Sequence, residues 1–159
     1  MDIGKFITNY TKSNSQQIRD EMIKKHVVAT YVPYETKIGE SLHIIDTSCY
    51  ETVNDKKIFW IDSPMRYILF MKAVVMLYTD LEFDTTNAMI QFNLLEQYNI
   101  FEKIIECIGT DYEKFQAVLN MTLDDRMTNE RSLAARFDSI GESIAMATEQ
   151  VLTALDTYQ

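Results

Sequence analysis

The chain has 159 residues, 47% of them hydrophobic, and this size and composition are typical of one globular domain. The chain has only 4 glycines and 2 prolines, and so few turn-forming residues favour helices over a fold of many short strands. With so few glycines the chain also has no glycine-rich loop to hold phosphate groups. The net charge of −9 is carried mostly by residues 64–159, which hold 15 acidic and 7 basic residues, so direct binding to nucleic acid is not expected.

The fold class that these features predict is mainly α. We expect a single domain, residues 1–159, in which several helices and a minor β-hairpin precede a long C-terminal helix. It consists of an N-terminal arm at 1–12, a mixed helix and hairpin part at 13–63, and a helical part at 64–159.

No segment predicts export or a membrane span. The first residues contain no continuous apolar run, and the most hydrophobic stretch, YILFMKAVVMLY, is interrupted by Lys72 and flanked by charges. Cys49 and Cys107 are far apart and belong to no CxxC pattern, so we expect free thiols in a reducing compartment. We therefore expect a soluble protein that is made in a cytoplasm and does not contact a membrane.

The first third of the chain alternates between helical and extended patterns. A helix can begin near Ser13–Ser15, and a run of β-branched and aromatic residues then leads to Pro33. From Tyr34 the helical spacing returns. The arm before these elements carries four apolar anchors, Ile3, Phe6, Ile7 and Tyr10. The helix after Pro33 is expected to bury one face, made of Ile38, Leu42 and Ile45.

A small hairpin is predicted next, turning near Asn54-Asp55, with residues 58–61 in its second strand. Trp60 in this strand has two interpretations. It is a contact anchor for a partner, since Trp is enriched in interface hot spots, or it closes the core against the helix that starts at Pro64.

A clear helix start follows at the sequence DSPMR. Ser63 offers an N-cap acceptor, and Pro64 fits the first helical position because its missing N–H costs nothing there. The helix that they open, Met65 to about Thr79, is apolar nearly all the way round, which predicts a place in the middle of the core. Its methionines also suit an adaptable binding surface, but core packing is the simpler interpretation.

The connector after this helix carries three alternating carboxylates, Asp80, Glu82 and Asp84. An EF-hand loop counted from Asp80 would need a glycine at its sixth position and a glutamate at its twelfth, where this chain has Thr85 and Gln91. A helix cap at Thr85 or Thr86, with the carboxylates near the positive end of the helix dipole, explains these residues better. No metal site is therefore expected.

Two signals mark the helices that follow. Gly109 is well placed to end a helix, and Thr110 to Glu113 has the spacing of a capping box for the next one. Between Thr110 and Leu155 there is no proline, so this stretch forms either one long helix or two helices broken at the polar run 124–132.

The C-terminal stretch predicts an interaction surface. Apolar residues recur at steps of three and four, a spacing that suits docking on another helix. These residues are Phe137, Ile140, Ile144, Ala147, Val151 and Leu155. With Trp60, the larger of these side chains are our candidate partner contacts, and other copies of the chain are the first candidates as partner.

Nothing in the sequence predicts catalysis. His26 and His43 are the only histidines, no nucleophile, phosphate-binding or zinc motif is present, and we read His43 with Asp46 as a surface pair. The acids Asp124, Asp125 and Glu130 are interleaved with arginines, which is typical of a solvated helix face. We therefore expect a protein without enzymatic activity and without a cofactor.

Three runs carry a resemblance to a known class: YVPYETKIGESLHIIDTSCY, DSPMRYILFMKAVVMLYTDLEFD and NERS. With them the chain resembles small proteins encoded among the virion-structure genes of tailed bacteriophages, over most of residues 25–135. The resemblance implies a non-enzymatic, multi-copy neck, head–tail connector or tail-assembly component that contacts other virion proteins and resides in the virion. It supplies no functional residues.

A different class of function is left open by the charge. An acidic regulatory or inhibitory protein could bind a basic host protein through its negative half. Salt-dependent binding to such a target distinguishes this alternative from an assembly component.

Overall fold

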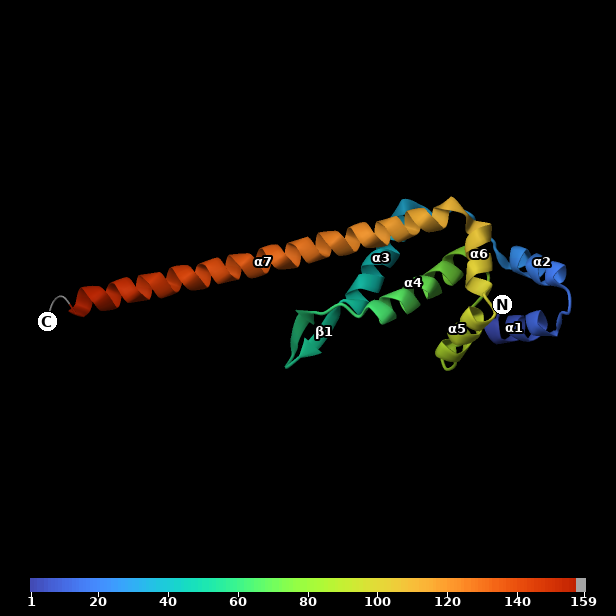
Figure 1. Cartoon of the computed structure of the whole chain (residues 1–159), viewed down its shortest axis with the longest axis horizontal. Coiled ribbons are helices and arrows are strands. Elements are labelled where there is room, and N and C mark those ends of the chain that lie inside the picture. Colours follow the sequence, from blue (N-terminus) through green and yellow to red (C-terminus); the bar gives the residue numbers. More distant parts are fainter. Residues whose placement is uncertain (157–159) are drawn as a thin grey trace. The chain divides into compact units, whose positions relative to one another are not determined.

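The computed structural model describes residues 1–156, with the side chains of residues 1–146 and 148. Within this range the chain is 74% helical, with seven helices and one two-stranded antiparallel hairpin. The predicted mainly α class, with its minor hairpin and long C-terminal helix, is confirmed (Figure 1). The chain divides into two units, Met1–Thr122 and Leu123–Gln159.

The segment predicted as an N-terminal arm, residues 1–12, contains a helix. Asp2 starts the helix α1 (Ile3–Lys12), since its carboxylate accepts a hydrogen bond from the Lys5 N–H at 3.0 Å. All four predicted anchors are buried in the core, because their spacing of three and four residues puts them on one face of a helix. The helix α2 (Gln16–His26) follows from Ser15, where the sequence predicts a start.

The helix α3 (Tyr34–Ser48) begins after Pro33 as predicted, but it buries a different face. Ile45 is buried, whereas Ile38 is 46% and Leu42 38% exposed. The buried side chains are Lys37, Ser41, Ile44, Ile45 and Ser48. The small serines let α3 pack closely on α4, and Lys37 finds a buried carboxylate, so a face that looks polar in sequence lies inside.

The hairpin is formed by β1 (Tyr50–Val53) and β2 (Lys56–Phe59), with Tyr50 opposite Phe59. Asn54 and Asp55 make its turn with φ angles of 51° and 60°, as a two-residue type I′ turn requires, which confirms the predicted position. Trp60 lies just beyond β2, where its backbone N–H donates to the Cys49 carbonyl at 3.0 Å.

The helix α4 (Ser63–Tyr78) packs against both α3 and α6 and supplies much of the core. Its N-cap is Asp62 rather than Ser63, because the Asp62 carboxylate accepts the Met65 N–H at 2.9 Å. Six of its residues are buried, as predicted for a core helix: Phe70, Met71, Ala73, Val74, Val75 and Tyr78. Met65, Tyr67 and Met76 are 41%, 49% and 62% exposed, so the helix is not buried all the way round, and core packing does not account for Met65 and Met76.

Two residues with positive φ angles mark the ends of the remaining helices of the first unit. Asn99, with a φ of 54°, connects α5 (Ala88–Gln97) to α6 (Ile100–Ile108), and Gly109, with a φ of 69°, ends α6 as predicted. The helix α7 (Thr110–Asp156) then begins, and it is one continuous helix rather than two. The two cysteines are free thiols, as expected: Cys49 is buried and Cys107 half-buried.

Candidate interaction surface

The helix α7 carries a row of exposed apolar side chains, which we call the α7 seam. Of the predicted contact residues, Phe137 is 71%, Ile140 55% and Ile144 62% exposed. Leu133, 49% exposed, extends the row by one turn. The sequence prediction missed Leu133 because it directly follows the polar run, although its spacing of four from Phe137 was a usable signal. Val151 and Leu155 lie on the same helix, but their side chains are outside the described part.

The acidic side chains near the middle of the seam, Asp138 and Glu142, lie on the opposite side of the helix. Asp138 and Glu142 are two residues from Ile140 on either side along the chain, so the helical turn of 100° per residue places both on the outer side. The residues beside the seam are instead small or uncharged, except Arg136. Gly141, Ala134 and Ser143 are the small ones among them. The seam is therefore an apolar strip, and the residues on either side of it, which we call its borders, are mostly small or uncharged.

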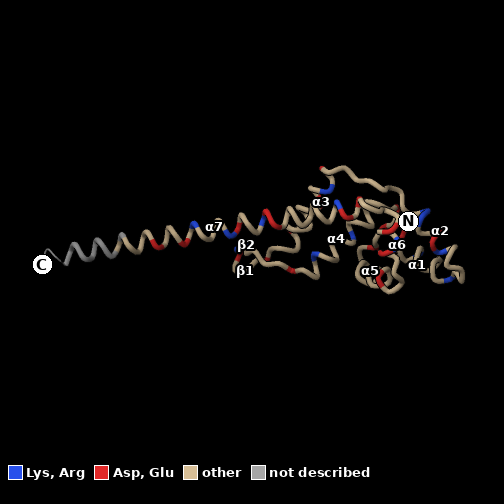
Figure 2. Tube along the Cα trace, turned by 45° about the horizontal axis from the view of Figure 1, so that its top comes forward, with Lys and Arg blue, Asp and Glu red and all other residues tan. Residues whose placement is uncertain are grey.

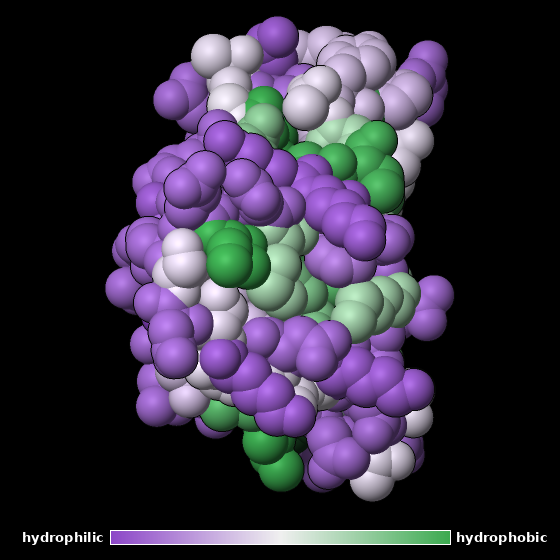
Figure 3. Space-filling model, turned by 90° about the vertical axis from the view of Figure 1, so that its right-hand side faces the viewer, coloured by the Kyte–Doolittle hydropathy of each residue, from purple (hydrophilic) through white to green (hydrophobic). Residues whose placement is uncertain are grey.

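A row of this kind indicates a partner. Single exposed apolar side chains are normal on a protein surface, whereas several aligned on one helix face mark an interaction site. Covering each such side chain fully with a partner contributes roughly 1.5–3 kcal/mol to the free energy of association. The face of the molecule seen in Figure 3, which shows the side where α1, α2 and α5 lie in Figure 1, is mainly hydrophilic, with hydrophobic side chains in small separate groups.

Trp60 is the second predicted contact residue, and it is 65% exposed. The interpretation in which it closes the core is therefore wrong. Beside it in the hairpin region, Val53 is 41% and Ile58 47% exposed. The role of Trp60 as a contact anchor stays a prediction.

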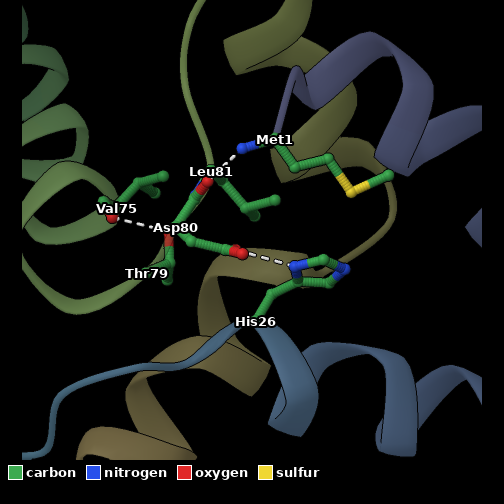
Figure 4. Close-up of polar contacts among 6 residues, drawn as sticks. All are labelled: Met1, His26, Val75, Thr79, Asp80 and Leu81. Carbon is green, nitrogen blue, oxygen red and sulfur yellow. Dashed lines mark hydrogen bonds and ion pairs between the residues drawn. The ribbon is translucent and has the colours of Figure 1, made fainter.

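The three acidic residues of the connector, Asp80, Glu82 and Asp84, each make contacts of their own. The Asp80 carboxylate lies 2.7 Å from His26 Nδ1, and its backbone carbonyl accepts a hydrogen bond from the amino group of Met1 (Figure 4). Glu82 pairs through its backbone: its N–H donates to the Met1 carbonyl at 2.8 Å, and its carbonyl accepts from the Ile3 N–H at 3.1 Å. Both residues thus tie the first residues of the chain to the connector.

Asp84 organises the turn before α5. Its carboxylate accepts the Thr86 N–H at 2.9 Å and the Asn87 side-chain amide at 2.8 Å. Both hydrogen bonds lower the pKa of Asp84, and the bond from Thr86 has the larger effect. The N-cap residue is Asn87, so the predicted cap at Thr85 or Thr86 is wrong. In the described part of the chain, no three His, Cys, Asp or Glu side chains gather as a metal site would require.

A buried ion pair lies elsewhere in the first unit. Lys37, with no exposed surface, donates to Asp111 Oδ1 at 2.7 Å. Asp111 Oδ2 accepts from the Tyr78 hydroxyl at 2.8 Å and from the Val32 N–H at 3.0 Å. Burial by itself raises the pKa of Asp111, but these donors, Lys37 foremost, outweigh burial and lower it. All members are engaged with one another, so the network serves to hold the fold.

The first unit also has a surface hollow of about 820 Å³ beside α4 and the connector. Met76, Leu81 and Phe83 contribute its apolar lining, and the Lys72 ammonium lies 5.4 Å from the centre of the Phe83 ring. Thr79 is part of the lining, but its hydroxyl already donates to the Val75 carbonyl at 2.6 Å and accepts from the Leu81 N–H. The hollow therefore offers apolar contact rather than an activated nucleophile.

Comparisons with protein-family models, with curated proteins and with solved structures give no match for this chain. Among the helices that the structure describes, none is both long and apolar enough to cross a bilayer.

Proposed function

We propose that this chain is a non-enzymatic interaction protein that works in several copies as a component of a larger assembly. The exposed α7 seam carries this proposal. An apolar strip on a long helix is a form in which helices dock on one another, and its anchors Phe137, Ile140 and Ile144 are the side chains that gain most from being covered.

The assembly that fits best is the virion of a tailed bacteriophage, with the chain in its neck, head–tail connector or tail-assembly apparatus. Support comes from the resemblance of residues 25–135 to small virion-structure proteins and from the helical architecture. The partners are then other copies of the chain and other virion proteins. The net charge of −9 gives no reason for direct contact with the packaged nucleic acid.

The proposal is tested by the protein composition of purified particles. Phage particles grown from a genome that encodes the chain are purified on a density gradient, and the copies per particle are counted by quantitative mass spectrometry. We expect several copies per particle and loss of the chain from particles with Ile144→Asp. Absence of the chain both from wild-type particles and from assembly intermediates contradicts the proposal.

A second candidate, an acidic inhibitor of a basic host protein, is favoured by the distribution of charge. Lys and Arg occur on α7 only up to Arg136, whereas Asp and Glu continue beyond it (Figure 2). In this case a host protein is captured by the purified chain at low salt and released as the ionic strength rises. The Ile144→Asp variant would bind that target as well as the wild type does.

A further inference from the structure

We infer that the α7 seam pairs with the seam of a second copy of this chain, and that the two helices run antiparallel with their two-fold axis beside residue 142. The inference rests on the proposed function and adds to it the orientation and register in which two copies pair. In this register Ile140 of one copy lies level with Ile144 of the other.

The charges of α7 favour the antiparallel orientation of two copies over the parallel one. Residues 123–136 carry three arginines and three acids and therefore have no net charge, whereas residues 137–156 carry four acids and no Lys or Arg. Antiparallel pairing sets the neutral stretch of each copy beside the acidic stretch of the other. A parallel pair would set the two acidic stretches side by side, where they repel each other.

The sizes of the seam residues point the same way. With Ile140 level with Ile144, the next layer places Phe137 level with Ala147, a large residue against a small one. The layer beyond pairs Leu133 with residue 151, a valine. A parallel pair would stack Phe137 on Phe137 and alanine on alanine, which leaves one layer crowded and another underfilled.

The borders of the seam are slimmest at the proposed axis. Next to residue 142, Gly141 of one copy faces Gly141 of the other on one side of the pair. On the opposite side, Ser143 faces Ser143. Nothing lies within 4 Å of the position that a Cβ at Gly141 would take, so this side of the helix is open to a neighbour. Small residues at this point allow two helix backbones to approach closely.

Cysteine cross-linking of the full-length protein tests the pairing and its orientation. The background carries Cys107→Ser, because Cys107 is half-buried, while Cys49 is fully buried and out of reach of oxidant. We expect Ser143→Cys, and independently Gly141→Cys, to give a covalent dimer in most of the protein on mild oxidation, because antiparallel pairing brings each residue against its own counterpart. Ile144→Cys, adjacent in sequence, is expected to cross-link no more than the background does.

Three results would overturn the inference. Efficient cross-linking of Ile144→Cys with none at Ser143→Cys or Gly141→Cys indicates parallel helices. A trimeric or larger mass in sedimentation of the uncross-linked protein excludes a pair, and a monomeric mass excludes a second copy on the seam. None of these results decides whether the chain is part of a particle, which the particle composition tests separately.

Discussion

At the scale of single residues, the unusual feature is a lysine with no exposed surface. The Lys37 ammonium lies 2.7 Å from Asp111 Oδ1, and it also lies 5.2 Å from the ring centre of Tyr31 and 5.1 Å from that of Tyr34. Ring faces attract a cation, so the aromatic pair assists Asp111 in stabilising the buried charge. The network joins α3, α4 and the first turn of α7, and it fixes residues that are far apart in sequence.

Replacing Lys37 should therefore be costly. Lys37→Met leaves Asp111 buried without its counter-charge, and breaking a buried pair in this way costs about 3–5 kcal/mol. We expect the free energy of unfolding, measured with urea, to fall by that amount. Lys25→Met on the exposed side of α2 is the matched control, and it should change stability by less than about 0.5 kcal/mol. Equal effects of the two changes would mean that the buried pair contributes little.

The same pair predicts how stability depends on acid. Burial disfavours the charged form of Asp111, but hydrogen bonds from Lys37, Tyr78 and Val32 outweigh it, so the pKa of Asp111 is lower in the folded state than in the unfolded chain. The stabilisation is complete above the unfolded pKa, about 4, and is lost as the pH falls through the folded pKa. Urea unfolding from pH 7 to pH 2 should show this loss, and it should be shallower in Asp111→Asn. An equally steep loss in that variant would assign it to other carboxylates.

At the scale of elements, the boundaries depend on a few backbone positions. Gly109 separates α6 from α7 with φ 69° and ψ −138°, a conformation that residues with a Cβ rarely adopt. Gly39 lies inside α3 with nothing within 4 Å of a Cβ built there. Two glycines with such different surroundings give a matched test.

Gly109→Ala should destabilise the protein by about 1–3 kcal/mol through backbone strain. Gly39→Ala should stabilise it by roughly 0.5–1 kcal/mol, because alanine loses less conformational freedom than glycine on joining a helix. Thermal unfolding of both variants checks the opposite signs. A destabilising Gly39→Ala would show that this side of α3 is packed against something.

Local signals account for the elements that could be predicted from the sequence. The turn at Asn54-Asp55, the end of α6 at Gly109 and the periodicity of the α7 seam each depend on neighbouring residues. The buried face of α3 could not be predicted, because Lys37 counts as polar until Asp111, 74 positions away, is known to lie beside it. The pairing of His26 with Asp80 likewise joins positions 54 residues apart, and no spacing rule encodes it.

At the scale of the whole molecule, the claim to be tested is that the α7 seam is a site of assembly. An apolar row on a helix is stable in water when a partner covers it, and a charge placed in the row would have to be buried with that partner. Such a charge should dissociate the assembly and leave the first unit, residues 1–122, folded.

The most direct measurement is the mass of the full-length protein in solution by light scattering, for the wild type, Ile144→Asp and Ala135→Asp. The last variant adds the same charge on the exposed outer side of α7. We predict an oligomeric mass for the wild type and Ala135→Asp and a monomeric mass for Ile144→Asp, with unchanged helical content by circular dichroism in all three. A monomeric wild type, or an oligomer that Ile144→Asp leaves intact, would contradict self-assembly through the α7 seam.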